Sequence, residues 1–162
     1  MYKVTKTYGP ERGFSCAFRQ WSAESNCRYL HGYSLGFKVE LESSTLDINN
    51  WVYDFGGLKD LKTTFNNQFD HTLVISGNDI HRDKFIALGE VGAADVRIME
   101  GGVGIEKFAE WVYKTADTYI AESTDGTNGF LGVVFNAIKR ERIKKRVVGD
   151  NVLRMVKYEN GR

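Results

Sequence analysis

The sequence predicts an α+β domain in which an antiparallel sheet carries its helices on one face. Stretches with strand-like alternation occur in pairs, each pair precedes a segment with helical spacing, and this order occurs twice along the 162 residues. The composition agrees, since 13% of the residues are aromatic and only 1 is proline. Each predicted helix has a single apolar stripe, so the helices are expected to cover one face of the sheet. The other face of so small a sheet must also be covered, and we expect oligomerisation to do this.

The first half of the chain has the more regular patterns. Strands are predicted over residues 3–8, 14–21 and 35–41, another extended piece begins at residues 51–54, and a helix runs from 58 to about 68. In the second strand, Phe14, Cys16 and Phe18 fall on one face. In the third, Leu35, Phe37, Val39 and Leu41 alternate with small or charged residues, as in a strand with one buried face.

The second half contains the clearest helix, which opens at Gly104. Its apolar stripe comprises Ile105, Phe108, Ala109, Val112, Ala116 and Tyr119. Before it, residues 72–75 are expected to be extended, 80–88 a short helix and 95–99 a short strand. After it, residues 123–132 are predicted as a loop, 133–138 are apolar, and 152–158 form a closing strand.

Charge and cysteine content exclude several classes of protein. The formal net charge is +1, so no large field of one sign points to nucleic acid or a membrane surface. Residues 139–146 carry six basic residues and one acid, but no aromatic residue is interleaved to stack bases, so a solvated surface is preferred to RNA binding. A polar start, no membrane-length apolar run and two cysteines lead us to expect a reduced, cytoplasmic protein with free thiols.

Two short motifs carry the candidate chemistry. In Cys27-Arg28-Tyr29-Leu30-His31-Gly32, a thiol precedes an imidazole by four residues. This spacing suits a metal-binding pair, a nucleophile with its base, or a structural coincidence. The second motif is Asp70-His71, in which the carboxylate could fix the tautomer of the imidazole if the chain turns there.

Four blocks in order resemble the 6-pyruvoyltetrahydropterin synthase family, which includes bacterial 6-carboxytetrahydropterin synthase. They are Phe14-Ser15-x-Ala17, Cys27-x-x-Leu30-His31-Gly32, Val52-Tyr53-Asp54-Phe55-Gly56-Gly57-Leu58-Lys59 and Phe69-Asp70-His71-Thr72-Leu73. The resemblance runs from residue 14 to about 120. It implies the tunnelling fold, in which a four-stranded antiparallel sheet carries two helices on its outer face, three subunits close a barrel, and two trimers stack. It also implies 7,8-dihydroneopterin triphosphate as substrate, bound at subunit boundaries.

The resemblance also assigns roles. Cys27 matches the family's general base, and Asp70 and His71 match the pair that relays or supplies a proton. Glu106, in Val103-Gly104-Ile105-Glu106-Lys107, matches the glutamate that accepts the paired N–H donors of the pterin ring. Glu159 is the best match for a second glutamate, but it could equally be a solvated terminal residue. Residues 123–151 read as divergent or inserted within a single domain spanning residues 1–162.

Only part of the family's zinc site is present. Family members bind zinc through three histidines, and these positions hold Phe18, His31 and Tyr33 here. One imidazole is too few for catalytic zinc, so loss of the metal is the preferred interpretation. A substitute site made of Cys16, His31 and either Tyr33 or Cys27 is the alternative. Without zinc, a developing oxyanion lacks its main stabiliser, and a hydrogen bond from Tyr33 would be a weaker one.

Two functions follow from the resemblance. The first is a lyase that forms 6-carboxytetrahydropterin or 6-pyruvoyltetrahydropterin in a pterin or 7-deazaguanine pathway, working as a trimer or hexamer. The second is a zinc-free module that binds a pterin or purine-like ring, with lost or altered catalysis.

Overall fold

The computed structural model describes residues 1–9, 14–124, 132–138 and 152–153, with side chains described as far as residue 124. The elements in chain order are β1 (Tyr2–Tyr8), β2 (Phe14–Phe18), η2 (Asn26–Arg28), β3 (His31–Ser43), η3 (Phe55–Leu58), α1 (Lys59–Phe69), β4 (Thr72–Ser76), α2 (Arg82–Glu90), β5 (Val96–Met99), α3 (Ile105–Ser123), β6 (Gly132–Ile138) and β7 (Val152–Leu153). Most predicted elements are therefore confirmed to within a few residues. The predicted extended piece at 51–54 is instead irregular and leads into η3.

The sheet is organised around the long strand β3. One edge of β3 pairs antiparallel with β1 and β2 in turn, through Tyr8↔Phe37 and Phe14↔Leu35, and the other pairs with β6. Beyond β2 lie β4 and β5, giving the order β5-β4-β2-β3-β6-β7 with β1 also on β3.

The prediction of a four-stranded antiparallel sheet with two helices is wrong in detail. The described residues form a seven-stranded mixed sheet, because β4 pairs parallel with β2 and β5 pairs parallel with β4. Parallel neighbours need a crossover connection, and α2 supplies it between β4 and β5. Strand alternation gives no information about the direction of a partner, so the sequence pattern could not distinguish these arrangements. Along the chain, the β4–α2–β5 unit lies between Asp70-His71 and α3, the helix that carries Glu106.

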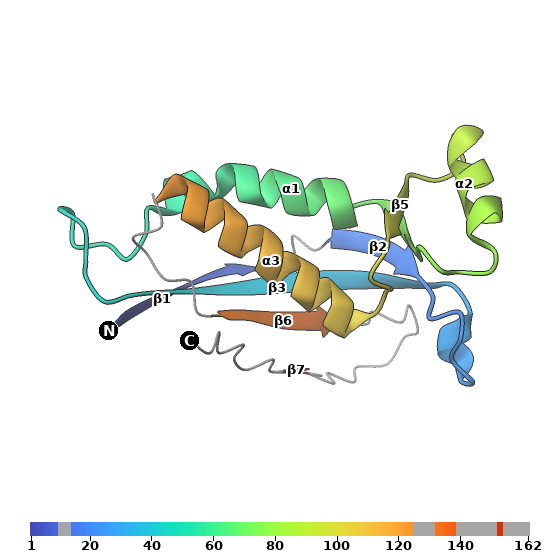
Figure 1. Cartoon of the computed structure of the whole chain (residues 1–162), viewed down its shortest axis with the longest axis horizontal. Helices are drawn as coiled ribbons and strands as arrows, with labels where there is room; N and C mark the ends of the chain where they lie inside the picture. Colours follow the sequence, from blue (N-terminus) through green and yellow to red (C-terminus); the bar gives the residue numbers. More distant parts are fainter. Residues whose placement is uncertain (10–13, 125–131, 139–151, 154–162) are drawn as a thin grey trace, which may run out of the picture.

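Helices α1 and α3 lie together over one face of the sheet, whereas α2 stands apart, beside β5 (Figure 1). Each of the two covering helices buries one stripe, and these residues are Leu61, Phe65 and Phe69 in α1 and Phe108, Ala109, Val112, Ala116 and Ile120 in α3. The ring centroids of Phe69 and Phe108 lie 4.9 Å apart, and those of Phe37 and Phe65 lie 5.4 Å apart. The predicted inward face of β2 is confirmed, since Phe14, Cys16 and Phe18 are all buried. None of the helices in the described part of the chain is long and apolar enough to cross a bilayer.

Polar residues alternate onto the opposite face of the sheet. Lys3 of β1 lies opposite Glu42 of β3, with 2.9 Å between the ammonium and a carboxylate oxygen, and 3.5 Å from Lys3 to Glu40. These charges raise the pKa of Lys3 above its ordinary value. This is the face that the sequence analysis expected a neighbouring subunit to cover, and oligomerisation stays a prediction.

Candidate functional site

Cys27 lies on a short, capped turn just after the end of β2. The turn is the short 3₁₀ helix η2, and the backbone N–H of Cys27 donates to Oγ of the N-cap residue Ser25 at 3.3 Å. The carbonyl of Cys27 accepts a hydrogen bond of 2.9 Å from the backbone N–H of Gln20. Both thiols are free, but Cys27 is exposed whereas Cys16 is buried. Burial raises the pKa of Cys16 to about 12, so Cys27 is the thiol available for chemistry at neutral pH.

His31 stands on the sheet face that the helices cover, directly opposite Phe18 in the β2–β3 ladder. Its Nδ1 lies 2.6 Å from the carbonyl oxygen of Tyr29, which leaves Nε2 as the nitrogen without a described contact. Tyr33 pairs with Cys16, so Phe18, His31 and Tyr33 share this face. The three positions of the expected metal site are therefore brought together.

Two of these three positions are used for packing. Phe18 is 3% exposed, its ring stacks on Tyr33 with 4.3 Å between centroids, and it meets Phe108 of α3 edge-on at 4.8 Å. Among the described residues, no group of three His, Cys, Asp or Glu side chains is close enough to hold a metal ion. The donor set therefore does not fit a catalytic zinc ion, which takes three protein ligands. Burial of Cys16 on the same strand also argues against the substitute site.

Glu106 lies in the first turn of α3, at the same end of the sheet as Cys27. The helix begins after Gly104, whose φ of 137° is favoured only for glycine. A Cβ at Gly104 would lie 2.8 Å from Gln20 Nε2 and 3.6 Å from Glu106 Oε2. Gln20 therefore connects two candidate residues, since its backbone holds Cys27 and its side chain lies beside Gly104. Gln20 was missed in the sequence analysis, because these contacts join residues that are far apart in the chain.

Asp70 and His71 form a contact pair at the end of α1. His71 Nδ1 lies 2.9 Å from Asp70 Oδ1, and the same carboxylate oxygen accepts from the backbone N–H of Ser15 at 3.2 Å. The His71 side chain is 86% exposed and its backbone has φ of 57°. Glycine is the usual residue in this left-handed position after a helix. A histidine there is consistent with selection for its side chain rather than for the backbone conformation.

The structure does not bring the two motifs together within one chain. Asp70 is bonded to Ser15 near the start of β2, whereas Cys27 is bonded to Gln20, beyond the end of that strand. Ser15 and Phe18 alone are separated by about 10 Å of strand. In Figure 1 the short blue helical turn lies past the end of β2, while α1 ends beside its start. One chain thus presents two candidate half-sites, Cys27 with Glu106 and Asp70 with His71.

Several expectations fall wholly or largely outside the residues that the structure describes. Glu159, the suggested second ring-binding glutamate, and the basic segment 139–146 lie wholly outside them. Most of the predicted loop at 123–132, of the predicted closing strand at 152–158 and of the divergent segment 123–151 does so as well.

Comparison with known proteins identifies the family. The family model for 6-pyruvoyl tetrahydropterin synthase matches residues 9–128, a range that includes Cys27, His31, Asp70, His71 and Glu106 but not Glu159. The chain belongs to the 6-pyruvoyl tetrahydropterin synthase family. The resemblance drawn from the four sequence blocks is thereby confirmed.

Curated relatives in this family match a limited region. The chain is 31% identical over 67 residues to the 6-carboxy-5,6,7,8-tetrahydropterin synthase of Rickettsia bellii and 30% identical over 67 residues to that of Rickettsia conorii. Each alignment covers 41% of this chain and 49% of the relative. The chain thus spans about half the length of the curated relatives it matches.

Solved structures show that the family fold extends over most of the chain. An uncharacterized protein from Wolinella succinogenes has a TM-score of 0.67 at 19% identity, with 86% of this chain and 98% of that one covered. The 6-pyruvoyl tetrahydropterin synthase of Plasmodium falciparum has a TM-score of 0.56 at 14% identity, with 85% and 91% covered. The corresponding enzyme of Caenorhabditis elegans gives 0.55 at 15% identity, with 86% and 96% covered. At these identities the likeness concerns the fold alone.

Proposed function

We propose that this chain is a pterin-synthase-like lyase that acts on 7,8-dihydroneopterin triphosphate and forms a 6-carboxy- or 6-pyruvoyl-tetrahydropterin product. The observation that carries the proposal is the placement of an exposed thiol, Cys27, at the same end of the sheet as the carboxylate of Glu106, with Gln20 in contact with both segments. A ring anchor and a base at one end of a rigid sheet suit a substrate with a heterocycle and a reactive side chain.

Glu106 is the group we assign to the pterin ring. Its carboxylate is exposed at the start of α3, and it forms no ion pair with Lys107, which bonds Glu110 instead. A carboxylate accepts two parallel N–H donors from the guanidine-like edge of a pterin, which fixes the ring in one orientation. Bound in this way, the ring would direct its side chain along the sheet end toward Cys27.

Cys27 and the Asp70–His71 pair would perform the proton transfers. The Cys27 thiolate takes a proton from a side-chain carbon of the substrate, triphosphate leaves with the electrons of its carbon–oxygen bond, and the His71 imidazolium, hydrogen-bonded to Asp70, returns a proton to the product. Because the two half-sites lie at opposite ends of β2, a complete set requires Cys27 from one chain and Asp70–His71 from another. This arrangement supports assembly as a trimer or hexamer, with the site at the subunit boundary.

The proposed chemistry does not include a zinc ion. Phe18 and Tyr33 are stacked on each other where two ligands would stand, which leaves His31 alone. Hydrogen-bond donors such as the Tyr33 hydroxyl would then have to stabilise a developing oxyanion, and they do so less strongly than a metal ion. We therefore expect turnover to be slow for this family.

A turnover assay on 7,8-dihydroneopterin triphosphate, read by mass spectrometry of the products together with metal analysis of the purified protein, tests the proposal. Wild-type protein is expected to form a tetrahydropterin product, and Cys27→Ala to lose at least about 100-fold of the rate. Cys16→Ala is the matched control, since it removes the buried thiol. Product formation that survives Cys27→Ala would overturn the assignment of the base.

The second candidate is a zinc-free module that binds a pterin or purine-like ring with lost or altered catalysis. The packing of Phe18 in the core favours it, because a position matched to a metal ligand of the family then contributes to folding stability instead. Ring binding without product, abolished by Glu106→Gln and unaffected by Glu122→Gln at the far end of α3, would support the module. If Glu106→Gln binds the ring as tightly as wild type, the assigned anchor is wrong in both candidates.

A further inference from the structure

Three consecutive residues after β2 each contact a segment that is distant in the chain or in a neighbouring turn. Arg19 forms two hydrogen bonds with the carboxylate of Asp79, from Nε at 2.8 Å and from Nη2 at 2.6 Å. Gln20 holds the carbonyl of Cys27 and lies beside Gly104. Trp21 Nε1 donates to Asn78 Oδ1 at 3.1 Å. The segment from Arg19 to Trp21 therefore connects the β4–α2 loop to both parts of the candidate half-site.

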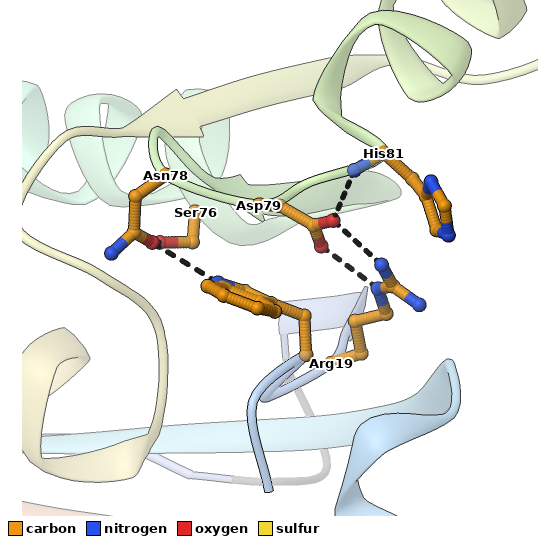
Figure 2. A network of polar contacts seen from close by, with 6 residues as sticks. Arg19, Ser76, Asn78, Asp79 and His81 are labelled. Atoms are coloured by element: carbon orange, nitrogen blue, oxygen red, sulfur yellow. Dashed lines mark hydrogen bonds and ion pairs between the residues drawn. The ribbon is translucent and has the colours of Figure 1, made fainter.

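The ion pair between Arg19 and Asp79, called the clamp below, has a fixed geometry. Figure 2 shows the guanidinium and carboxylate facing each other, with the backbone N–H of His81 donating to the same carboxylate at 2.8 Å. The Asp79 side chain is 0% exposed and that of Arg19 is 16% exposed. The guanidinium carbon also lies 5.2 Å from the ring centroid of Phe85 on α2. A bidentate pair shielded from water fixes orientation as well as distance.

A second contact, between Trp21 and Asn78, joins the same two segments. Asn78 Oδ1 accepts from Ser76 Oγ at 2.6 Å as well as from Trp21, so two donors fix the carboxamide (Figure 2). Both contacts come from the loop that connects β4 to α2, in a unit whose elements were predicted from the sequence but whose parallel strand pairing was not. Neither Asp79 nor Asn78 belongs to a motif of the family resemblance.

We propose that Asp79 is a positioning residue, which through Arg19 holds the segment 19–21 and thereby sets the place of the Cys27 turn relative to Glu106. The proposal rests on the proposed function for its catalytic consequence, but its structural part does not depend on which reaction is catalysed. The β4–α2–β5 unit thus holds the Cys27 half-site in place, and this role is called the brace below. The Gln20–Cys27 backbone bond transmits this support, since it joins the braced segment to the turn.

The test is Asp79→Asn, which keeps the shape of the side chain and an acceptor for the His81 N–H but removes the charge that Arg19 binds. Amide hydrogen exchange reports on the clamp directly. We expect exchange at Gln20, Ala23 and Arg28, whose amides are hydrogen-bonded in this turn, to rise at least about tenfold, with amides in the β3 core unchanged. Arg19→Lys, which keeps the charge without the bidentate geometry, should give an intermediate rise.

Turnover provides the second measurement. Displacement of a base by a fraction of an ångström affects the chemical step more than binding, so kcat should fall about tenfold or more while KM changes little. Glu110→Gln is the matched control, since it removes a carboxylate that pairs with Lys107 and Lys114 at the surface of α3 and should leave both measurements unchanged. Trp21→Phe, which removes only the indole donor, should cause a smaller change of the same kind and decides the matter if Asp79→Asn does not fold.

The outcomes separate this proposal from the proposed function. Unchanged exchange across residues 20–28 in Asp79→Asn, or an equal rise throughout the chain, would overturn the positioning role. A local rise in exchange with no turnover in the wild-type protein would support the brace and contradict the lyase.

Discussion

Phe18 pairs directly with His31 across the β2–β3 ladder, so a core residue and a candidate metal ligand stand next to each other on the same face of the sheet. The ring of Phe18 also packs against Tyr33 and Phe108, at the junction of the sheet with α3. Two of the three positions that the sequence resemblance matches to the family's zinc ligands, Phe18 and Tyr33, thus pack against each other here. The predictions below test this replacement of metal ligands by packing residues and the other parts of the candidate site.

Phe18→Ala should destabilise the protein by about 3–5 kcal/mol, because it removes a buried aromatic ring and leaves a cavity between β2 and α3. Chemical denaturation measures this free energy of unfolding. Ile48→Ala, at a side chain that is 97% exposed, serves as control and should change stability by less than about 0.5 kcal/mol. A small effect of Phe18→Ala would mean that the ring does not belong to the core.

The two cysteines should react very differently. At pH 8 a thiol reagent is expected to modify Cys27 in the native protein, whereas Cys16 should react only after unfolding, because burial raises its pKa to about 12. Counting modified thiols with and without denaturant checks this. Rapid modification of Cys16 in native protein would contradict its position in the core.

His71→Gly should stabilise the protein and abolish turnover. Glycine adopts the left-handed conformation of residue 71 without the cost borne by histidine, a gain of about 1 kcal/mol. The same change removes the imidazole that contacts Asp70. Thermal unfolding and turnover are measured together, and His81→Gly, at an exposed histidine with φ of −113°, should bring no such gain. Full turnover in His71→Gly would exclude the proton-transfer role.

Mixed assemblies should recover activity lost in single variants. Cys27→Ala and Asp70→Asn are each expected to be inactive, but co-assembled in equal amounts they should regain about one quarter of wild-type turnover, if each site takes one half from each of two chains. Turnover before and after co-refolding is the measurement. If co-assembled oligomers show no activity, the half-sites do not combine across subunits.

The Arg19–Asp79 pair should make stability depend on acid pH. Burial alone would raise the pKa of Asp79, but the hydrogen bonds from Arg19 and the His81 backbone outweigh it, and the pKa lies below its ordinary value of 3.8. The stabilisation is therefore complete above the pKa of the unfolded chain and is lost as the pH falls through the lower, folded value. Asp79→Asn should be less stable than wild type by about 3 kcal/mol at pH 7, and the difference should shrink below about pH 4. A constant difference from pH 7 to 2 would contradict this assignment.

Elements with strong local periodicity could be predicted from the amino-acid sequence. The stripes of α1 and α3 and the alternation of β2 and β3 follow from the burial of one side of each element, which depends only on residue spacing. The motif residues and the family were also available from sequence, as was the incomplete zinc set, because residue identity alone decides which donors are present.

The arrangement of these parts in space could not be predicted in this way. The parallel pairing of β4 with β2, the α2 crossover and the clamp between Arg19 and Asp79 all join residues whose partners lie far away in the chain. The same is true of the separation between Cys27 and Asp70, which depends on where α1 returns the chain to β2. Local patterns carry no information on such contacts, since they are fixed by the packing of the whole sheet. The sequence therefore determined which chemical groups are present, and the packing decided which of them meet.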